Sequence, residues 1–94
     1  MRRYTIILTP ETDDDGSAIY TVEVPALPTC HTWGESIEHA LTMARDVVEL
    51  VTGCLSDTGT LLPDDVTEFP AGVDPHYVYT LHFHDPADRL AATA

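Results

Sequence analysis

A proline-punctuated turn followed directly by a capped amphipathic helix constrains the fold of this chain more than any other feature. Pro25 and Pro28 end an extended segment, because proline fixes φ and restricts the residue before it. Ser36 then offers the side-chain oxygen that helix N-caps favour. Apolar residues follow it at the three-and-four spacing of one buried stripe: Ile37, Ala40, Leu41, Ala44, Val47, Val48, Val51 and Leu55. A strand, a sharp turn and a one-sided helix predict a small α+β domain.

Three segments are typical of β-strands. Residues 4–9 are rich in β-branched side chains, and we expect Pro10 to end this strand. Residues 18–24 predict its antiparallel partner, with Gly16 in the intervening turn available for a positive φ. Residues 77–84 alternate most clearly between apolar and polar side chains. The apolar face of this last strand, expected to be core beneath the helix, comprises Tyr77, Tyr79, Leu81 and Phe83.

A short third strand is expected at residues 30–32, and the helix is expected to fray or stop near Gly53. The resulting order is β-β-β-α-β, an α+β fold in which a single helix covers one face of a small, antiparallel-rich sheet. We expect residues 1–85 to form one domain and residues 86–94 a short C-terminal tail. The uncovered face of the sheet is expected to be exposed or used for association.

Charge is the extreme feature of the composition. Sixteen acidic residues face four arginines and no lysine, for a formal net charge of -12. Such a surface repels phosphate backbones, so we expect no nucleic-acid binding by this chain alone. It would attract a basic partner and speed the encounter with it. Adaptation to a salt-loving or GC-rich host is the alternative explanation of this acidity.

The expected compartment is the cytoplasm. No charged leader precedes an apolar run, and no apolar stretch approaches the roughly 20 residues that a membrane-spanning helix needs. The two cysteines, Cys30 and Cys54, are expected to be free thiols. They would lie roughly 30 Å apart at the two ends of a continuous helix.

The turn and the helix start resemble the signature of the HicB antitoxin family, approximately P-x-L-P-G-C-x-T-x-G-D-T-x-E-E-A-L. The residues that match it are Pro25, Leu27, Pro28, Cys30, Thr32, Gly34, Glu35, Ser36, Glu38, Ala40 and Leu41. Gly16 in the first turn, Ala44 in the helix and the turn at residues 59–63 also fit. The resemblance covers residues 3–84. It implies a partial ribonuclease-H-like fold, assembly into homodimers or tetramers, and inhibition of HicA, a small basic ribonuclease, by covering its active site.

Three departures from the family pattern bear on these expectations. Thr29 stands where glycine is common, so this turn needs a different backbone solution. His39 replaces the second acidic residue, so part of the reciprocal helix cap is expected to be lost. Nothing after His84 is long or basic enough for the DNA-binding module of full-length HicB proteins. We therefore expect the sheet-and-helix domain alone, without operator binding.

Hydrolysis and metal binding are alternatives to a function that consists of binding a partner only. The acidic residues Glu11, Asp13, Asp14, Asp15 and Glu23 suggest two-metal hydrolysis, but a run of aspartates in a turn is usually only solvated. His82 and His84 share one face of the last strand, and Cys30 with His31 could approach them to hold a metal. Paired histidines on an exposed sheet are more often incidental or lie at a partner contact. Cys30 has no evident base beside it for nucleophilic catalysis.

Trp33 has two interpretations. An aromatic residue next to a helix start more often closes the edge of the core, and a partly exposed one can anchor a partner. We expect core closure first and a partner contact second.

The leading hypothesis is an antitoxin-like protein that acts by stoichiometric binding, with no catalytic residue, cofactor or metal. The alternative is an orphan homo-oligomeric module of the same fold that serves as a scaffold or binds a small ligand, without a toxin. A hydrolase comes third. Self-association is expected in either binding case, because a four-stranded sheet with one helix leaves a face and two edges uncovered.

Overall fold

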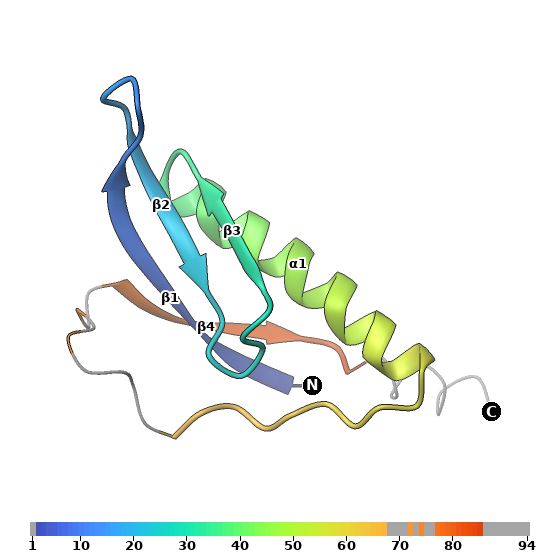
Figure 1. Cartoon of the computed structure of the whole chain (residues 1–94). Helices are drawn as coiled ribbons and strands as arrows, with labels where there is room; N and C mark the ends of the chain where they lie inside the picture. The colour runs from blue at the N-terminus through green and yellow to red at the C-terminus, as the bar shows by residue number, and fades with distance from the viewer. Residues whose placement is uncertain (1, 68–71, 73, 75–76, 86–94) are drawn as a thin grey trace.

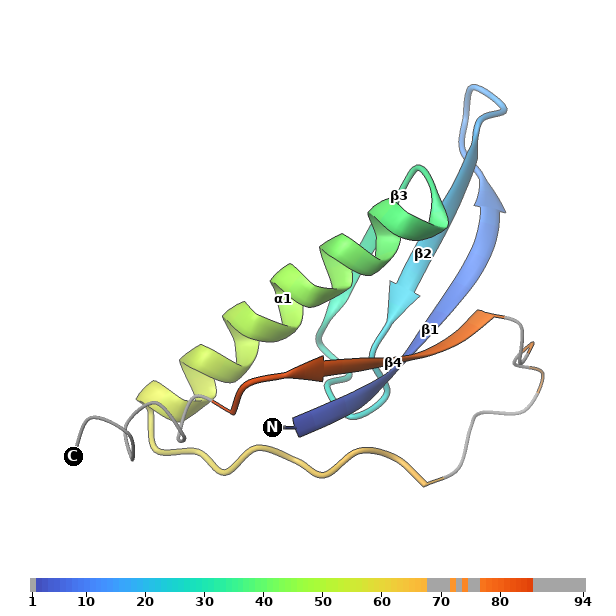
Figure 2. The same cartoon turned by 180° about the vertical axis from the view of Figure 1, so that it is seen from behind.

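One helix lies across one face of a four-stranded sheet in this protein (Figures 1 and 2). The structure is a computed structural model that describes residues 2–67, 72, 74 and 77–85, so the expected tail at residues 86–94 lies outside the described residues. The elements are β1 (Arg2–Thr12), β2 (Ala18–Glu23), β3 (His31–Gly34), α1 (Ile37–Asp57) and β4 (Val78–Phe83). The predicted β-β-β-α-β order and α+β class are confirmed.

The sheet is antiparallel throughout, in the order β3-β2-β1-β4. The first half of β1 pairs with β4 and the second half with β2, the two registers meeting at Ile7. Pro10 lies inside β1, opposite Tyr20, so the expectation that it ends the strand is wrong. Among the described residues, β1 has no neighbour on the β4 side beyond Ile7. An open edge tolerates a proline, which has no N–H to donate.

The β1–β2 hairpin projects beyond the start of α1 (Figure 1). Its loop closes through Asp13 N–H donating to the Ser17 carbonyl and Gly16 N–H donating to the Asp13 carbonyl, both at 3.0 Å. Gly16 has a φ of +86°, which confirms the predicted use of glycine in this turn. The Asp13 carboxylate also accepts the N–H groups of Asp15 and Ser17. The loop is therefore held by its own hydrogen bonds.

The start of α1 is capped at two backbone amides. Ser36 is the N-cap, and its Oγ accepts the His39 N–H at 3.0 Å, as predicted. The Glu35 N–H donates to Nδ1 of His39 at 3.0 Å. A capping box would bond the N-cap amide of Ser36, so the expected loss of that reciprocal bond is not contradicted; the imidazole nitrogen accepts a different backbone hydrogen. The bond reaches the residue before the N-cap.

The helix ends later than the sequence suggested. Gly53 lies inside α1 with open space around its Cα, so the expected stop there is wrong. After Thr58, Gly59 has a φ of +75°, its N–H donates to the Ser56 carbonyl, and the Thr60 N–H donates to the Leu55 carbonyl. This pair of bonds is a Schellman motif, which stops a helix wherever glycine can adopt the left-handed conformation.

The core lies between α1 and the sheet. Its buried residues are Tyr4, Ile6, Leu8, Val22, Val24, Ala26, Leu27, Cys30, Ala40, Ala44, Val48, Leu81 and Phe83, with Ile37, Leu41, Val47, Val51, Leu55, Tyr20, Tyr77 and Tyr79 packed against them. The predicted helix stripe and the apolar face of the last strand are both confirmed. Thr52 is also buried. Its hydroxyl can be buried at little cost because Oγ1 donates a hydrogen bond to the Val48 carbonyl at 2.7 Å.

The connection from β2 to β3 folds into the core. Two successive turns close where Leu27 N–H donates to the Val24 carbonyl at 2.9 Å and Cys30 N–H donates to the Leu27 carbonyl at 2.8 Å. No described residue other than glycine has a positive φ, so Thr29 fits with an ordinary backbone conformation. Cys30 is only 1% exposed. Ala26, Leu27 and Cys30 thus join the core from this connection, while Pro28 and Thr29 stay exposed.

The segment after the helix, residues 58–67, returns along the sheet (Figure 2). The Asp65 carboxylate accepts the Thr5 N–H at 2.8 Å and the Thr5 hydroxyl at 2.9 Å. The Pro63 carbonyl accepts the Tyr4 hydroxyl at 2.7 Å. Asp65 thereby satisfies a β1 amide in the part of the strand that β2 does not reach. The segment fixes the N-terminal half of β1 and leaves β2 and β3 uncovered on the face turned away from α1.

Candidate binding surface on the open sheet face

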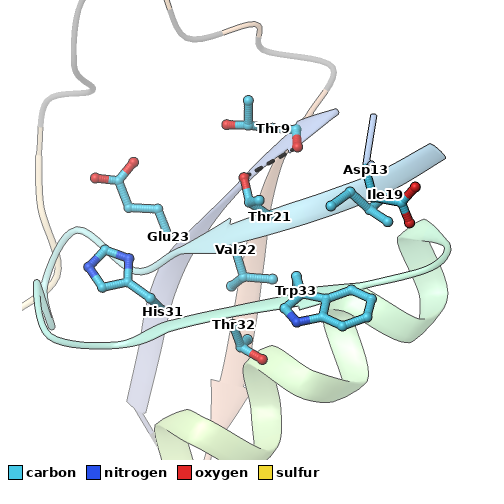
Figure 3. A pocket seen from close by; sticks show the side chains of 9 residues that line it. All are labelled: Thr9, Asp13, Ile19, Thr21, Val22, Glu23, His31, Thr32 and Trp33. Atoms are coloured by element: carbon cyan, nitrogen blue, oxygen red, sulfur yellow. Dashed lines mark hydrogen bonds between the residues drawn. The ribbon is translucent and has the colours of Figure 1, made fainter. Parts of the chain in front are cut away.

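The side of the sheet turned away from α1 carries a hollow of about 760 Å³ over β2 and β3 (Figure 3). We call it the open-face hollow. It is lined by Thr9, Asp13, Ile19, Thr21, Val22, Glu23, His31, Thr32 and Trp33. Its volume falls in the range of ligand and side-chain binding pockets in proteins.

Strand register sets the geometry of this hollow. Thr9, Thr21 and Trp33 form one row across β1, β2 and β3, and Glu23 lies opposite His31 in the next row of the same face. Thr21 Oγ1 donates to the Thr9 carbonyl at 3.4 Å. Figure 3 shows the indole of Trp33 at one end of the hollow, with Glu23 and His31 together at the other. An aromatic surface and a carboxylate therefore border one concave site.

Trp33 is 51% exposed, so the expectation that it closes the edge of the core is wrong. The physical reason is strand alternation. β3 runs to Gly34, and Gly34 is buried against the start of α1, so the residue before it must face the opposite side. If the third strand had been predicted to extend to Gly34, alternation would have placed Trp33 on the open face.

The hollow is electronegative. Asp13 and Glu23 border it, and the described residues that line it include no arginine or lysine. Two described arginines are held elsewhere, and the third, Arg3, lies on β1 opposite His82 and outside the lining. Arg2 Nε donates to Asp85 at 2.6 Å, a bond that raises the pKa of the guanidinium, and Arg45 donates to the His82 carbonyl. No ion pair among the described residues neutralises Glu23.

The histidines of the last strand are not near the cysteine-histidine pair. His82 lies on β4 and His31 on β3, and these strands form opposite edges of the sheet. Three strand spacings separate them, about 14 Å. Cys30 is buried, which raises the pKa of its thiol, while His82 and His84 are exposed. The suggestion that these groups approach one another is wrong.

The carboxylates considered for hydrolysis are also dispersed. Asp13, Asp14 and Asp15 occupy the hairpin loop, and Glu11 and Glu23 lie four positions apart along the open face. Within residues 2–67, 72, 74 and 77–85, no three His, Cys, Asp or Glu side chains are grouped so that they could hold a metal ion.

The residues of the family signature lie in the turn after β2, in β3, at the start of α1 and in the hairpin loop. Leu27 and Cys30 are buried in the turn, and Pro25 is half-buried and Pro28 exposed beside them. Gly34 packs on the backbone of Ala40, so closely that a Cβ would lie 2.6 Å from the Ala40 Cα. The remaining members are the cap residues Glu35, Ser36 and Glu38, half-buried Leu41, buried Ala44, Gly16 in the hairpin loop, and Thr32, which lines the open-face hollow. Most of the signature thus lies in turns, cap and packed positions, and the other residues that line the hollow are not part of it.

Fold and surface together define a small α+β domain with one sheet face packed against α1 and the other face open over β2 and β3. The structure's described part contains no helix with the length and apolarity to cross a membrane. The family model for the HicB-like antitoxin of bacterial toxin–antitoxin systems matches residues 4–77, and the chain belongs to this family. The family supports an antitoxin role, implies a protein partner such as a toxin, and suggests a role without catalysis.

Individual relatives agree with this assignment. A UPF0150 protein of Thermoplasma acidophilum is 35% identical over 66 residues, which cover 70% of this chain and 90% of that protein. A UPF0150 protein of Archaeoglobus fulgidus is 35% identical over 48 residues, covering 51% of this chain and 64% of that protein. The crystal structure of the N-terminal domain of Burkholderia pseudomallei antitoxin HicB superposes with a TM-score of 0.58 at 25% identity, covering 87% of this chain and 98% of that one.

Proposed function

We propose that this protein neutralises a small basic ribonuclease of the HicA type by covering its active site. The observation that carries the proposal is the match of residues 4–77 to the HicB-like antitoxin family. The net charge of -12 supports it, because an acidic surface can occupy a groove built for RNA phosphates. Inhibition of this kind needs contact only and no bond-making group on the antitoxin.

The inhibitory surface must be solvent-accessible and of opposite charge to the toxin. The open sheet face meets both requirements, since Glu23 and Trp33 are exposed there and α1 covers the other side. The backbone that carries these carboxylates is already ordered in the sheet, so binding loses less conformational entropy than it would with a flexible tail.

The test uses the gene next to this one in its native host. The adjacent small basic protein is expressed, its cleavage of a defined RNA is followed on a denaturing gel, and this protein is added in increasing ratio. We expect cleavage to stop at a one-to-one ratio, and this protein alone to leave the RNA intact with Mg²⁺ or Mn²⁺ present. Undiminished cleavage at a tenfold excess, or the lack of any basic neighbour or co-purifying basic protein, would contradict the proposal.

We also propose that the protein self-associates through the outer edge of β4. In the described part of the sheet this edge has no paired strand, and a groove of about 310 Å³ lined by Ile6, Leu41, Tyr79 and Leu81, among others, runs beside it against α1. An unpaired edge is a template for another strand. Sedimentation velocity at micromolar concentration should show a dimer or larger species. Thr80→Lys, which puts a charge on this exposed edge position, should shift it to monomer, and a monomeric wild-type protein would refute self-association.

A further inference from the structure

We infer that the open-face hollow receives an arginine side chain of a basic protein partner, its guanidinium stacked on Trp33 and hydrogen-bonded to Glu23. This inference rests on the proposed function, because it names the contact through which a cationic toxin would be held. It goes further in assigning one surface, two residues and one type of side chain.

The spacing of the two groups suits a guanidinium. Glu23 lies two residues along β2 from Thr21, and Thr21 is directly opposite Trp33. Diagonal neighbours on one face of adjacent strands stand about 7–8 Å apart. A planar guanidinium presents its face to an indole and its edge donors to a carboxylate at the same time, whereas an ammonium group offers no flat face. The volume of the hollow, about 760 Å³, is large enough to admit such a side chain.

Charge complementarity favours an arginine side chain over a nucleic acid or a second copy of this chain. A nucleic acid would bring phosphates against Glu23 and Asp13, which have the same sign. A second copy of this chain, in a symmetric contact, would bring the same carboxylates against one another, because a twofold axis places one patch on itself. A cationic side chain meets complementary charge. The described lining residues include no arginine or lysine to compete with it, and His31, opposite Glu23, is the one basic side chain among them.

The exposure of Trp33 makes the inference measurable. It is the chain's one tryptophan and is 51% exposed, so its fluorescence reports directly on occupancy of the hollow. The probe is a blocked tetra-arginine peptide, compared with blocked tetralysine at equal ionic strength. We expect a saturable change in emission with tetra-arginine, and an affinity at least fivefold lower for tetralysine.

A matched pair of variants separates local binding from general attraction. Glu23→Gln and Asp46→Asn each remove one exposed negative charge, the first in the hollow and the second on α1. We expect Glu23→Gln to weaken tetra-arginine binding about five- to tenfold and Asp46→Asn to weaken it less than twofold. Equal weakening by both variants, equal affinity for tetralysine, or unchanged emission would overturn the inference.

Capture of the basic toxin separates failure of this inference from failure of the proposed function. If the toxin binds wild-type protein and Trp33→Leu equally well, the function stands and the arginine site is refuted. If tetra-arginine binds at Trp33 but no ribonuclease is inhibited, the site stands and the function is refuted. Loss of self-association in Trp33→Leu, with its melting temperature unchanged, would show that a second copy occupies the hollow and would overturn the inference.

Discussion

Among the described glycines, Gly34 is the one whose substitution by alanine should destabilise this protein most. A Cβ at Gly34 would lie 2.6 Å from the Ala40 Cα and 2.8 Å from the His39 carbonyl carbon, with the Ala40 nitrogen nearer still. Carbon atoms reach their best contact at about 3.5–4.0 Å, so β3 and the first turn of α1 would have to separate by about 1 Å. These are backbone atoms that cannot turn aside like a side chain.

The cost of that separation can be placed within bounds. Overpacking a well-packed core typically costs about 1–3 kcal/mol, and we expect the upper part of this range because backbone must move at Gly34. In a domain of this size, 1 kcal/mol shifts the melting temperature by about 4–8 °C. Gly34→Ala should therefore melt about 10–20 °C below the wild-type protein in thermal unfolding followed by circular dichroism.

Gly53→Ala is the matched control. Nothing lies within 4 Å of a Cβ added there, and the residue is inside α1, so the same change should stabilise the protein by about 0.5–1 kcal/mol. Opposite shifts for Gly34→Ala and Gly53→Ala would show that close approach of β3 to α1 is the cause. A melting temperature for Gly34→Ala within 2 °C of wild type would refute the reasoning.

Three further outcomes are expected. Ser36→Ala removes the acceptor for the His39 N–H, so urea unfolding should show a loss of about 1 kcal/mol, and an unchanged midpoint would contradict the cap. Because burial raises the pKa of the Cys30 thiol while Cys54 is exposed, a chromogenic disulfide reagent should react with one thiol in the native protein and two in denaturant, and two rapid native reactions would refute burial. A hydrogen bond with the Asp13 side chain and, to a lesser extent, hydrogen bonds with Ser17 lower the pKa of Asp15 from 3.8 to about 2. Carbon NMR should therefore show the Asp15 carboxylate ionised until the pH falls to about 2, and titration at the ordinary pKa would contradict the loop geometry. Any stability that this carboxylate contributes is present above pH 3.8 and is lost as the pH falls toward 2.

The helix and the strands could be predicted because their patterns are strongly periodic. The stripe from Ile37 to Leu55 and the alternation from Tyr77 to Phe83 each leave one face apolar, and the structure buries both faces against each other. Ser36 could be assigned as N-cap from its residue type and place alone. Local chemistry decides all these features.

The errors arose where tertiary context outweighs local preference. Pro10 continues a strand because no described residue pairs with β1 at that level on the side of β4, and this depends on where β4 begins. Gly53 stays helical because the stripe continues to Leu55 and the Schellman motif follows at Gly59. His39 adds a bond that the sequence did not indicate, because its imidazole nitrogen accepts the N–H of Glu35, the residue before the N-cap.

The candidate site was harder to predict than the fold because it depends on strand order. Strands adjacent in sequence, β1 to β3, bring Thr9, Glu23 and Trp33 to one face, while β4 joins the far edge and takes His82 away from them. No local pattern states on which side of β1 the last strand will pair.

The same strands provide packing and the proposed recognition surface through alternate residues, and this separates the two roles. In β2 and β3, Val22 and Gly34 face α1 and are buried, while Glu23 and Trp33 face the open side. A strand places successive side chains on opposite faces, so substitutions in the exposed set leave the contacts of the buried set intact. If the proposed contact is made there, substitution of exposed positions on β2 and β3 should change the partner recognised without loss of the sheet that presents them.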